Sequence, residues 1–209
     1  MPHNINRFIT EINRSSILQS SKYEITISPP PVLAGATIST LYGPQKTTET
    51  ILSEARFFAS DTNIPGVIFG TSEVRRDGLG PSEKKPFAPG FTDVFIRFIV
   101  DGNGQILSFF HAWMNAIYNF STADQSNQTR GFSYNLQNEL TYKNDYVSNI
   151  TIIPYTVTGK EAMGIQLIEA FPVFINDTPL SWAATNNPMK ITVGFSFRTW
   201  NTENVEVIR

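Results

Sequence analysis

Few residues of this sequence are of the types that commonly carry catalysis. The chain has two histidines and no cysteine. His3 lies in the N-terminal tail, and His111 lies beside an apolar stripe with helical spacing, where a satisfied or half-buried structural histidine is favoured over a catalytic one. Because thiolates are absent and imidazoles are so few, we expect no zinc site and no other metal ligands.

The carboxylates and glycines offer equally little. A glycosidase needs a pair of carboxylates, and the sequence alone does not bring together the four candidates Asp93, Asp101, Glu161 and Glu169. Residues 78–81 (Gly-Leu-Gly-Pro) are a weak match to a phosphate loop, since they do not precede a helix. No Gly-x-Ser-x-Gly nucleophile elbow occurs. The sequence therefore favours a protein that is not an enzyme and that uses no cofactor.

The charge balance argues against tight nucleic-acid binding. Sixteen basic and 18 acidic residues give a net charge of −2, whereas tight binding of phosphates requires a basic surface. Charged residues make up 16% of the chain, below the usual proportion of about a quarter. Weakly charged surfaces often contact other protein. No apolar run approaches a membrane span, so we expect a soluble protein made in the cytoplasm, without a membrane partner.

The C-terminal part of the chain alternates between apolar and polar residues with the two-residue period of a half-buried strand. One side carries Ile191, Val193, Phe195 and Phe197. The other side carries Thr192, Ser196 and Arg198. Because a register slip by one residue would expose the whole apolar set, we expect the first side to lie in the core and the second to be exposed.

Similar patterns predict further strands, turns and helices. Strands are expected over residues 23–28, 52–59, 91–101, 150–153 and 165–171. Pro172 should end or bend the last of these strands. The turn at 63–66 (Asn-Ile-Pro-Gly) predicts a positive φ at Gly66. Residues 75–90 are expected to form a solvated loop or hairpin.

Two stretches have the spacing of amphipathic helices. The stronger stripe consists of Ile106, Phe109, Phe110, Trp113 and Ile117. Phe110 and Trp113 are therefore assigned to the core. A weaker stripe of Ile5, Phe8, Ile9 and Ile12 predicts a short N-terminal helix. We expect this helix to pack on its own domain, with contact to a neighbouring subunit as the alternative.

Taken together, these elements predict a mainly β protein with a minor helical part. The expected architecture is an antiparallel β-sandwich or barrel with one packed helix and a short N-terminal helix. The length of 209 residues favours a single domain over residues 1–209.

The order of particular motifs resembles the tail tube protein family of contractile-tailed bacteriophages. The similarity includes Pro65-Gly66 after a strand and Phe109-Phe110 shortly before Trp113. It continues through residues 145–150, residues 167–172 and Leu180-Ser181-Trp182. Relative to a minimal family member, residues 32–50 and 123–142 look expanded.

The resemblance implies a homohexameric ring that completes a multi-subunit β-barrel and stacks into a hollow tube. It also implies a place in the virion tail, assembly in the host cytoplasm, and sheath, baseplate and tail terminator proteins as partners. DNA would pass through the lumen and make only transient contacts. Thr192, Ser196 and Arg198 would then face the lumen. A channel for sliding DNA should lack a basic lining, and Thr192 and Ser196 satisfy this, with Arg198 as the one exception.

Several alternatives stay open at this point. The chain could be the repeating tube subunit, a baseplate ring that initiates or adapts the tube, or the tube of a contractile injection system. A more distant alternative is a β-sandwich that binds carbohydrate through exposed aromatic residues. An enzyme built on carboxylates is the third class considered.

Overall fold

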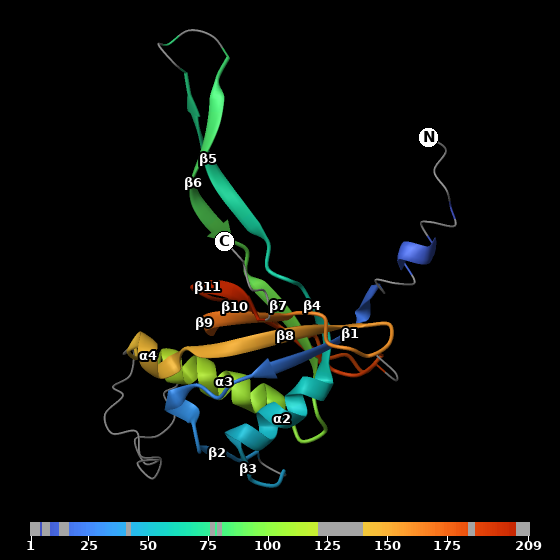
Figure 1. The fold of residues 1–209 in the computed structure, drawn as a ribbon. Coiled ribbons are helices and arrows are strands. Elements are labelled where there is room, and N and C mark those ends of the chain that lie inside the picture. Colours follow the sequence, from blue (N-terminus) through green and yellow to red (C-terminus); the bar gives the residue numbers. More distant parts are fainter. Residues whose placement is uncertain are drawn as a thin grey trace.

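The computed structural model describes residues 5, 9–12, 17–40, 43–75, 78, 81–120, 140–183 and 187–203. Its body is a seven-stranded antiparallel sheet with the order β1-β8-β9-β10-β7-β4, and β11 pairs with β9. Helices α2 and α3 lie under one face of this sheet, whereas the β5–β6 hairpin projects away from the body (Figure 1). The predicted mainly β, antiparallel class is therefore confirmed.

The described strands and helices have the following bounds along the chain. The strands are β1 (Leu18–Ile27), β2 (Thr37–Ile38), β3 (Lys46–Thr47), β4 (Ala59–Thr62), β5 (Val67–Val74), β6 (Glu83–Phe91), β7 (Val94–Ile99), β8 (Ser148–Thr156), β9 (Gly164–Ile175), β10 (Lys190–Ser196) and β11 (Thr199–Glu203). The helical elements are η1 (Pro31–Leu33), α2 (Thr48–Phe58), α3 (Gln105–Ile117) and α4 (Lys143–Tyr146).

Strand β9 gives the sheet its barrel-like shape, because its two halves have different partners. Leu167 in the first half pairs with β8 on one side and with β11 on the other. Pro172 in the second half pairs with Phe195 of β10. The outermost strands β1 and β4 then approach each other, and Tyr23 Oη donates to the Ala59 carbonyl at 3.4 Å. The sheet is thus a nearly closed barrel with one open groove, lined by residues of β1 and β4.

An aromatic cluster joins α3 to the sheet. The Phe110 ring lies 5.0 Å from that of Phe98 on β7 and 6.1 Å from that of Phe195 on β10. Trp113 lies 6.1 Å from Phe195, and its Nε1 donates to the Tyr146 carbonyl at 2.8 Å. Phe110, Trp113, Val193 and Phe195 are fully buried, whereas Phe197 is partly buried and packs on Phe91 at the base of the hairpin.

The predicted strand over residues 52–59 is wrong, because this segment is part of helix α2. The buried residues Ile51, Leu52 and Ala55 have helical spacing, and the Thr47 side chain caps the helix by accepting from Thr50 N at 3.4 Å. The strand prediction began inside the helix and missed this cap. Two helices therefore pack on the sheet, rather than the one that the sequence predicted.

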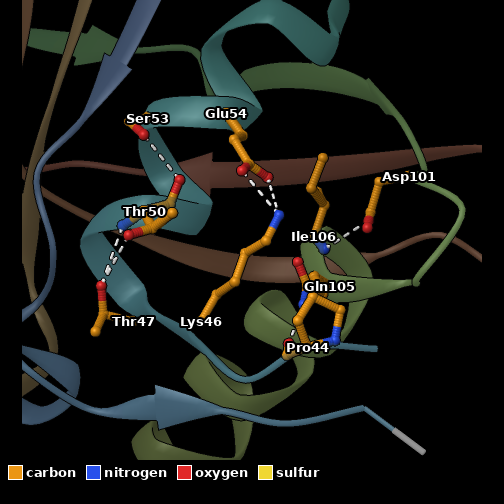
Figure 2. A network of polar contacts seen from close by, with 9 residues as sticks. All are labelled: Pro44, Lys46, Thr47, Thr50, Ser53, Glu54, Asp101, Gln105 and Ile106. Carbon is orange, nitrogen blue, oxygen red and sulfur yellow. Dashed lines mark hydrogen bonds and ion pairs between the residues drawn. The ribbon is translucent and has the colours of Figure 1, made fainter. Parts of the chain in front are cut away.

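The described residues of the expanded segment 32–50 are tied into the helical layer. Figure 2 shows the contacts that hold them. Lys46 forms an ion pair with Glu54 of α2 at 2.7 Å, and the buried Gln105 donates to the Pro44 carbonyl at 2.6 Å. In the same view, Asp101 Oδ1 accepts from Ile106 N at the start of α3 at 3.1 Å.

The structure corrects the expectations for Gly66 and for the start of β7, and it decides between the two outcomes expected at Pro172. Gly66 does not have a positive φ, so the predicted turn is wrong. Within this segment Asn63 bonds to β7 instead: its Oδ1 accepts from Phe95 N at 2.6 Å. Strand β7 begins only at Val94, since Phe91 belongs to β6. Strand β9 continues through Pro172, so the proline does not end the strand. A register shift in the pairing with β10 lies beside Pro172 and marks the expected bend.

The N-terminal and central polar segments are only partly described. Residues 5 and 9–12 are helical, and Phe8 lies outside the described residues. Ile5 and Ile9 are exposed. The structure therefore does not show these two side chains packed on their own domain. The expected expansion over residues 123–142 lies outside the described residues up to residue 139.

Candidate assembly surfaces

Strand alternation builds a second sheet face, which α2 and α3 do not cover. We call it the uncovered face and define it by Asp61, Phe95, Arg97, Phe174 and Thr192. Thr192 lies between buried Ile191 and Val193 and is paired in register with Arg97 of β7.

Polar contacts link three neighbouring strands on the uncovered face. Arg97 Nε donates to Thr192 Oγ1 at 3.4 Å, and its NH1 lies 3.3 Å from Asp61 Oδ2 on β4. The arginine charge on this face is thus held between a hydroxyl and a carboxylate.

An aromatic patch interrupts the polar part of the uncovered face. The Phe174 ring lies over Gly194, where an added Cβ would come within 2.3 Å of Phe174 Cε1. The Phe174 and Phe95 rings are 5.7 Å apart, and both side chains are partly exposed. A side chain at position 194 would therefore force the Phe174 ring to move, because the ring occupies the space of a Cβ.

The three residues predicted to face the lumen have different neighbours. Thr192 contacts Arg97, and Ser196 lies opposite Phe171 in the pairing of β10 with β9. Arg198 follows the end of β10, in a break before β11, and its backbone N–H donates to the Ile168 carbonyl at 3.1 Å. The prediction treated residues 190–200 as one continuous strand and did not anticipate this break.

Beside the break, Glu169 is the one described non-glycine residue with a positive φ, at 55°. It lies in a bulge of β9 opposite Asn149, whose Oδ1 accepts from Glu169 N at 3.4 Å. The Glu169 carboxylate binds Lys143 Nζ and also Arg198 NH1, the latter at 2.5 Å. These hydrogen bonds, from Lys143 first and then from Arg198, hold the pKa of the Glu169 carboxyl below its ordinary value.

The β5–β6 hairpin is a second candidate surface. Residues 75–90, predicted to form a loop or hairpin, are part of this hairpin, and β6 makes up the second half of that range. Several of its apolar side chains are exposed: Val67, Ile68, Phe69, Val74 and Phe87. Ile68 and Phe87 are 63% and 73% exposed. Apolar patches of this kind mark interaction sites, and the sequence analysis missed this one because it weighed only the charged residues of the segment.

The connection between β9 and β10 carries a third group of exposed apolar residues. Leu180 is 83% exposed, and the Trp182 side chain is fully exposed. Both lie in the Leu180-Ser181-Trp182 motif that the sequence analysis singled out.

The structure does not gather the residues considered for catalysis. His111 is exposed on α3, rather than half-buried as expected. Asp101 and Glu169 have the structural partners described above. Within the described part of the chain, no three His, Asp or Glu side chains come together as metal ligands. None of its helices is long and apolar enough to cross a membrane.

Solved structures of contractile injection systems have a similar fold. A chain of the sheath–tube complex of an extracellular contractile injection system (PVC) in the extended state is 15% identical, with a TM-score of 0.56. The match covers 94% of this chain and 97% of that one. A chain of the sheath/tube terminator of that system is 14% identical, with a TM-score of 0.54 over 90% and 96% of the two chains.

A chain of the anti-feeding prophage baseplate gives a TM-score of 0.54 at 9% identity, over 90% of this chain and 95% of that one. At such identities these likenesses concern the fold alone. No curated protein matches the chain. The family model described as phage tail tube protein matches residues 18–203, which include every described strand. The chain therefore belongs to the phage tail tube protein family.

Proposed function

We propose that this protein is the subunit of a homohexameric ring that stacks into the inner tube of a contractile phage tail and conducts DNA. The observation that carries the proposal is the β5–β6 hairpin, which projects from the body (Figure 1) and exposes several apolar side chains. A two-stranded hairpin is marginally stable alone in water. Its apolar residues gain stability when another surface covers them, and in a homomeric tube that surface belongs to a neighbouring copy.

We assign the uncovered face to the lumen of the ring. The opposite face is occupied by α2 and α3, so only the uncovered face is free to line a channel. Thr192, Ser196 and Arg198 are the proposed lumen residues. A face with few charges, whose arginine at position 97 is paired with a carboxylate, holds DNA phosphates weakly.

The proposed partners are further copies of the chain, the sheath, the baseplate and the tail terminator. The protein would be a component of the virion tail, assembled in the host cytoplasm. A baseplate ring that initiates the tube, or the tube of an injection system, is the alternative that the similar structures favour, since they include a chain of a baseplate and a chain of a sheath–tube complex.

Negative-stain electron microscopy of the purified protein tests the proposal. We expect rings or tubes, either spontaneously or after addition of the tail initiator. Ile68→Asp combined with Phe87→Asp should prevent stacking but leave the unfolding midpoint nearly unchanged, because both side chains are exposed in the subunit. Leu140→Asp is the matched control, since Leu140 is 65% exposed but lies outside the hairpin. Monomers under all conditions, including with the initiator, would contradict the proposal.

A further inference from the structure

The backbone at Glu169 points to a role for its side chain. Its φ of 55° lies in the left-handed region, which glycine adopts without strain and other residues adopt at a cost. The bulge in β9 needs this conformation, but it does not need a carboxylate. A glutamate at a position that glycine fits best points to a function for the carboxylate itself.

The carboxylate is the least exposed member of a cluster with two cations. The Glu169 side chain is 27% exposed, whereas those of Lys143 and Arg198 are 48% and 66% exposed. The two cations come from separate elements, α4 and the break between β10 and β11. With the carboxylate between the two cations, the cluster has one net positive charge instead of two. The carboxylate also accepts from N–H donors of the cations that would otherwise be free to bind phosphate.

The bulge that carries Glu169 faces away from the core on its Asn149 side, and Lys143 reaches it from α4, which packs beside α3 and η1. Asn149, directly across from the bulge, is exposed between the buried residues Ser148 and Ile150. The same pairing of arginine with carboxylate occurs on the uncovered face between Arg97 and Asp61. Guanidinium groups bind phosphate strongly through paired hydrogen bonds, and a carboxylate competes for the same donors.

We propose that Glu169 masks Arg198 and Lys143, so that these cations do not bind the phosphates of DNA moving along the lumen. The inference rests on the proposed conduit function, since a surface past which DNA slides must not retain it. Glu169 is in this view a positioning residue, which acts on DNA only through the two cations it holds. The ligand whose binding Glu169 weakens is the phosphate backbone of a duplex, irrespective of its base sequence.

The test measures binding of a short DNA duplex to the purified full-length chain by fluorescence anisotropy, between about 50 and 200 mM salt. Glu169→Gln removes the negative charge and frees the cations. We expect tighter binding at low salt and a slope of log affinity against log salt that is steeper by about one to two, since each new phosphate contact adds about 0.9. Adding Arg198→Gln to Glu169→Gln should lower the slope again by about 0.9, the share of one phosphate contact, because Lys143 stays unmasked.

Glu161→Gln is the control for net charge. Glu161 is exposed and makes no ion pair with a described residue, so its replacement changes the net charge equally but frees no cation. We expect its slope to equal that of the wild type. If Glu169→Gln folds poorly, Glu169→Gly gives the same comparison, because glycine suits the backbone at this position.

A wild-type slope in the folded Glu169 variants, or an equal increase in Glu161→Gln, would overturn the masking role. The measurement does not require a ring, so its failure leaves the tube function to be judged by microscopy. Conversely, monomers in every micrograph combined with a steeper slope in Glu169→Gln would remove the tube but retain the masking of the two cations.

Discussion

The Trp113 site allows a quantitative test of how α3 is attached to the sheet. Trp113→Ala removes a fully buried indole that contacts Phe109, Phe110 and Phe195, and it removes the hydrogen bond from Nε1 to the Tyr146 carbonyl. Truncation of a large buried aromatic residue costs about 3–5 kcal/mol in unfolding free energy. With a denaturant slope of about 2–3 kcal/mol per molar urea, the unfolding midpoint should fall by about 1–2.5 M.

Two further variants separate the parts of this effect. Trp113→Phe retains a ring but leaves the Tyr146 carbonyl without its donor, so we expect a smaller loss of about 1–3 kcal/mol. Trp182→Ala is the matched control, because Trp182 is fully exposed, and its effect should stay within about 0.5 kcal/mol. Urea unfolding followed by far-ultraviolet circular dichroism gives all three midpoints. Equal midpoints for Trp113→Ala and Trp182→Ala would refute the packing argument.

Three other predictions concern the sheet. Gly194→Ala should cost about 1–3 kcal/mol through overpacking against Phe174, and the cost should shrink when Phe174→Ala is added, as a double-mutant cycle of unfolding free energies will show. Ser196→Lys should leave the unfolding midpoint nearly unchanged but slow DNA passage in assembled tails, whereas Phe195→Lys should abolish folding because it buries an unpaired charge; the reverse result would mean that the two faces were assigned backwards. Because the folded-state pKa of Glu169 is lowered below its ordinary value of 4.5, its ion pairs contribute stability above that pH, and the contribution is lost as pH falls through the lowered pKa. The difference in unfolding free energy between wild type and Glu169→Gln should therefore shrink in acid, and a difference independent of pH would argue against the ion pairs.

Local periodicity was enough to predict the elements whose burial follows from their own sequence. The apolar stripe of α3 and the alternation in β10 both place their buried residues where the structure has them. The same reasoning failed at α2, because the cap at Thr47 lies before the window that suggested a strand. Short apolar runs are ambiguous between helix and strand when their ends are misjudged.

The candidate surfaces depended on non-local pairing and were less predictable. The bulge at Glu169 arises from the register of β9 against β8, and the break at Arg198 arises from β10 and β11 pairing with different halves of β9. Neither feature has a signature in the local sequence. The exposed apolar side chains of the hairpin also have no signature in the local sequence, because the pattern of a single strand does not indicate whether another element covers that strand. The lumen assignment of Thr192, Ser196 and Arg198 remains a proposal for the same reason.

The pairing of β1 with β8 has a consequence for the timing of folding during synthesis. Ile27 near the start of the chain pairs with Ile150, and β8 in turn pairs with β9. Strand β1 therefore waits without its partner while the whole hairpin and α3 leave the ribosome. Sheets closed by such distant contacts form slowly, since a long loop must be closed before any contact compensates for it. The nascent chain thus completes this sheet only after β11 has left the ribosome, well after β1 has emerged.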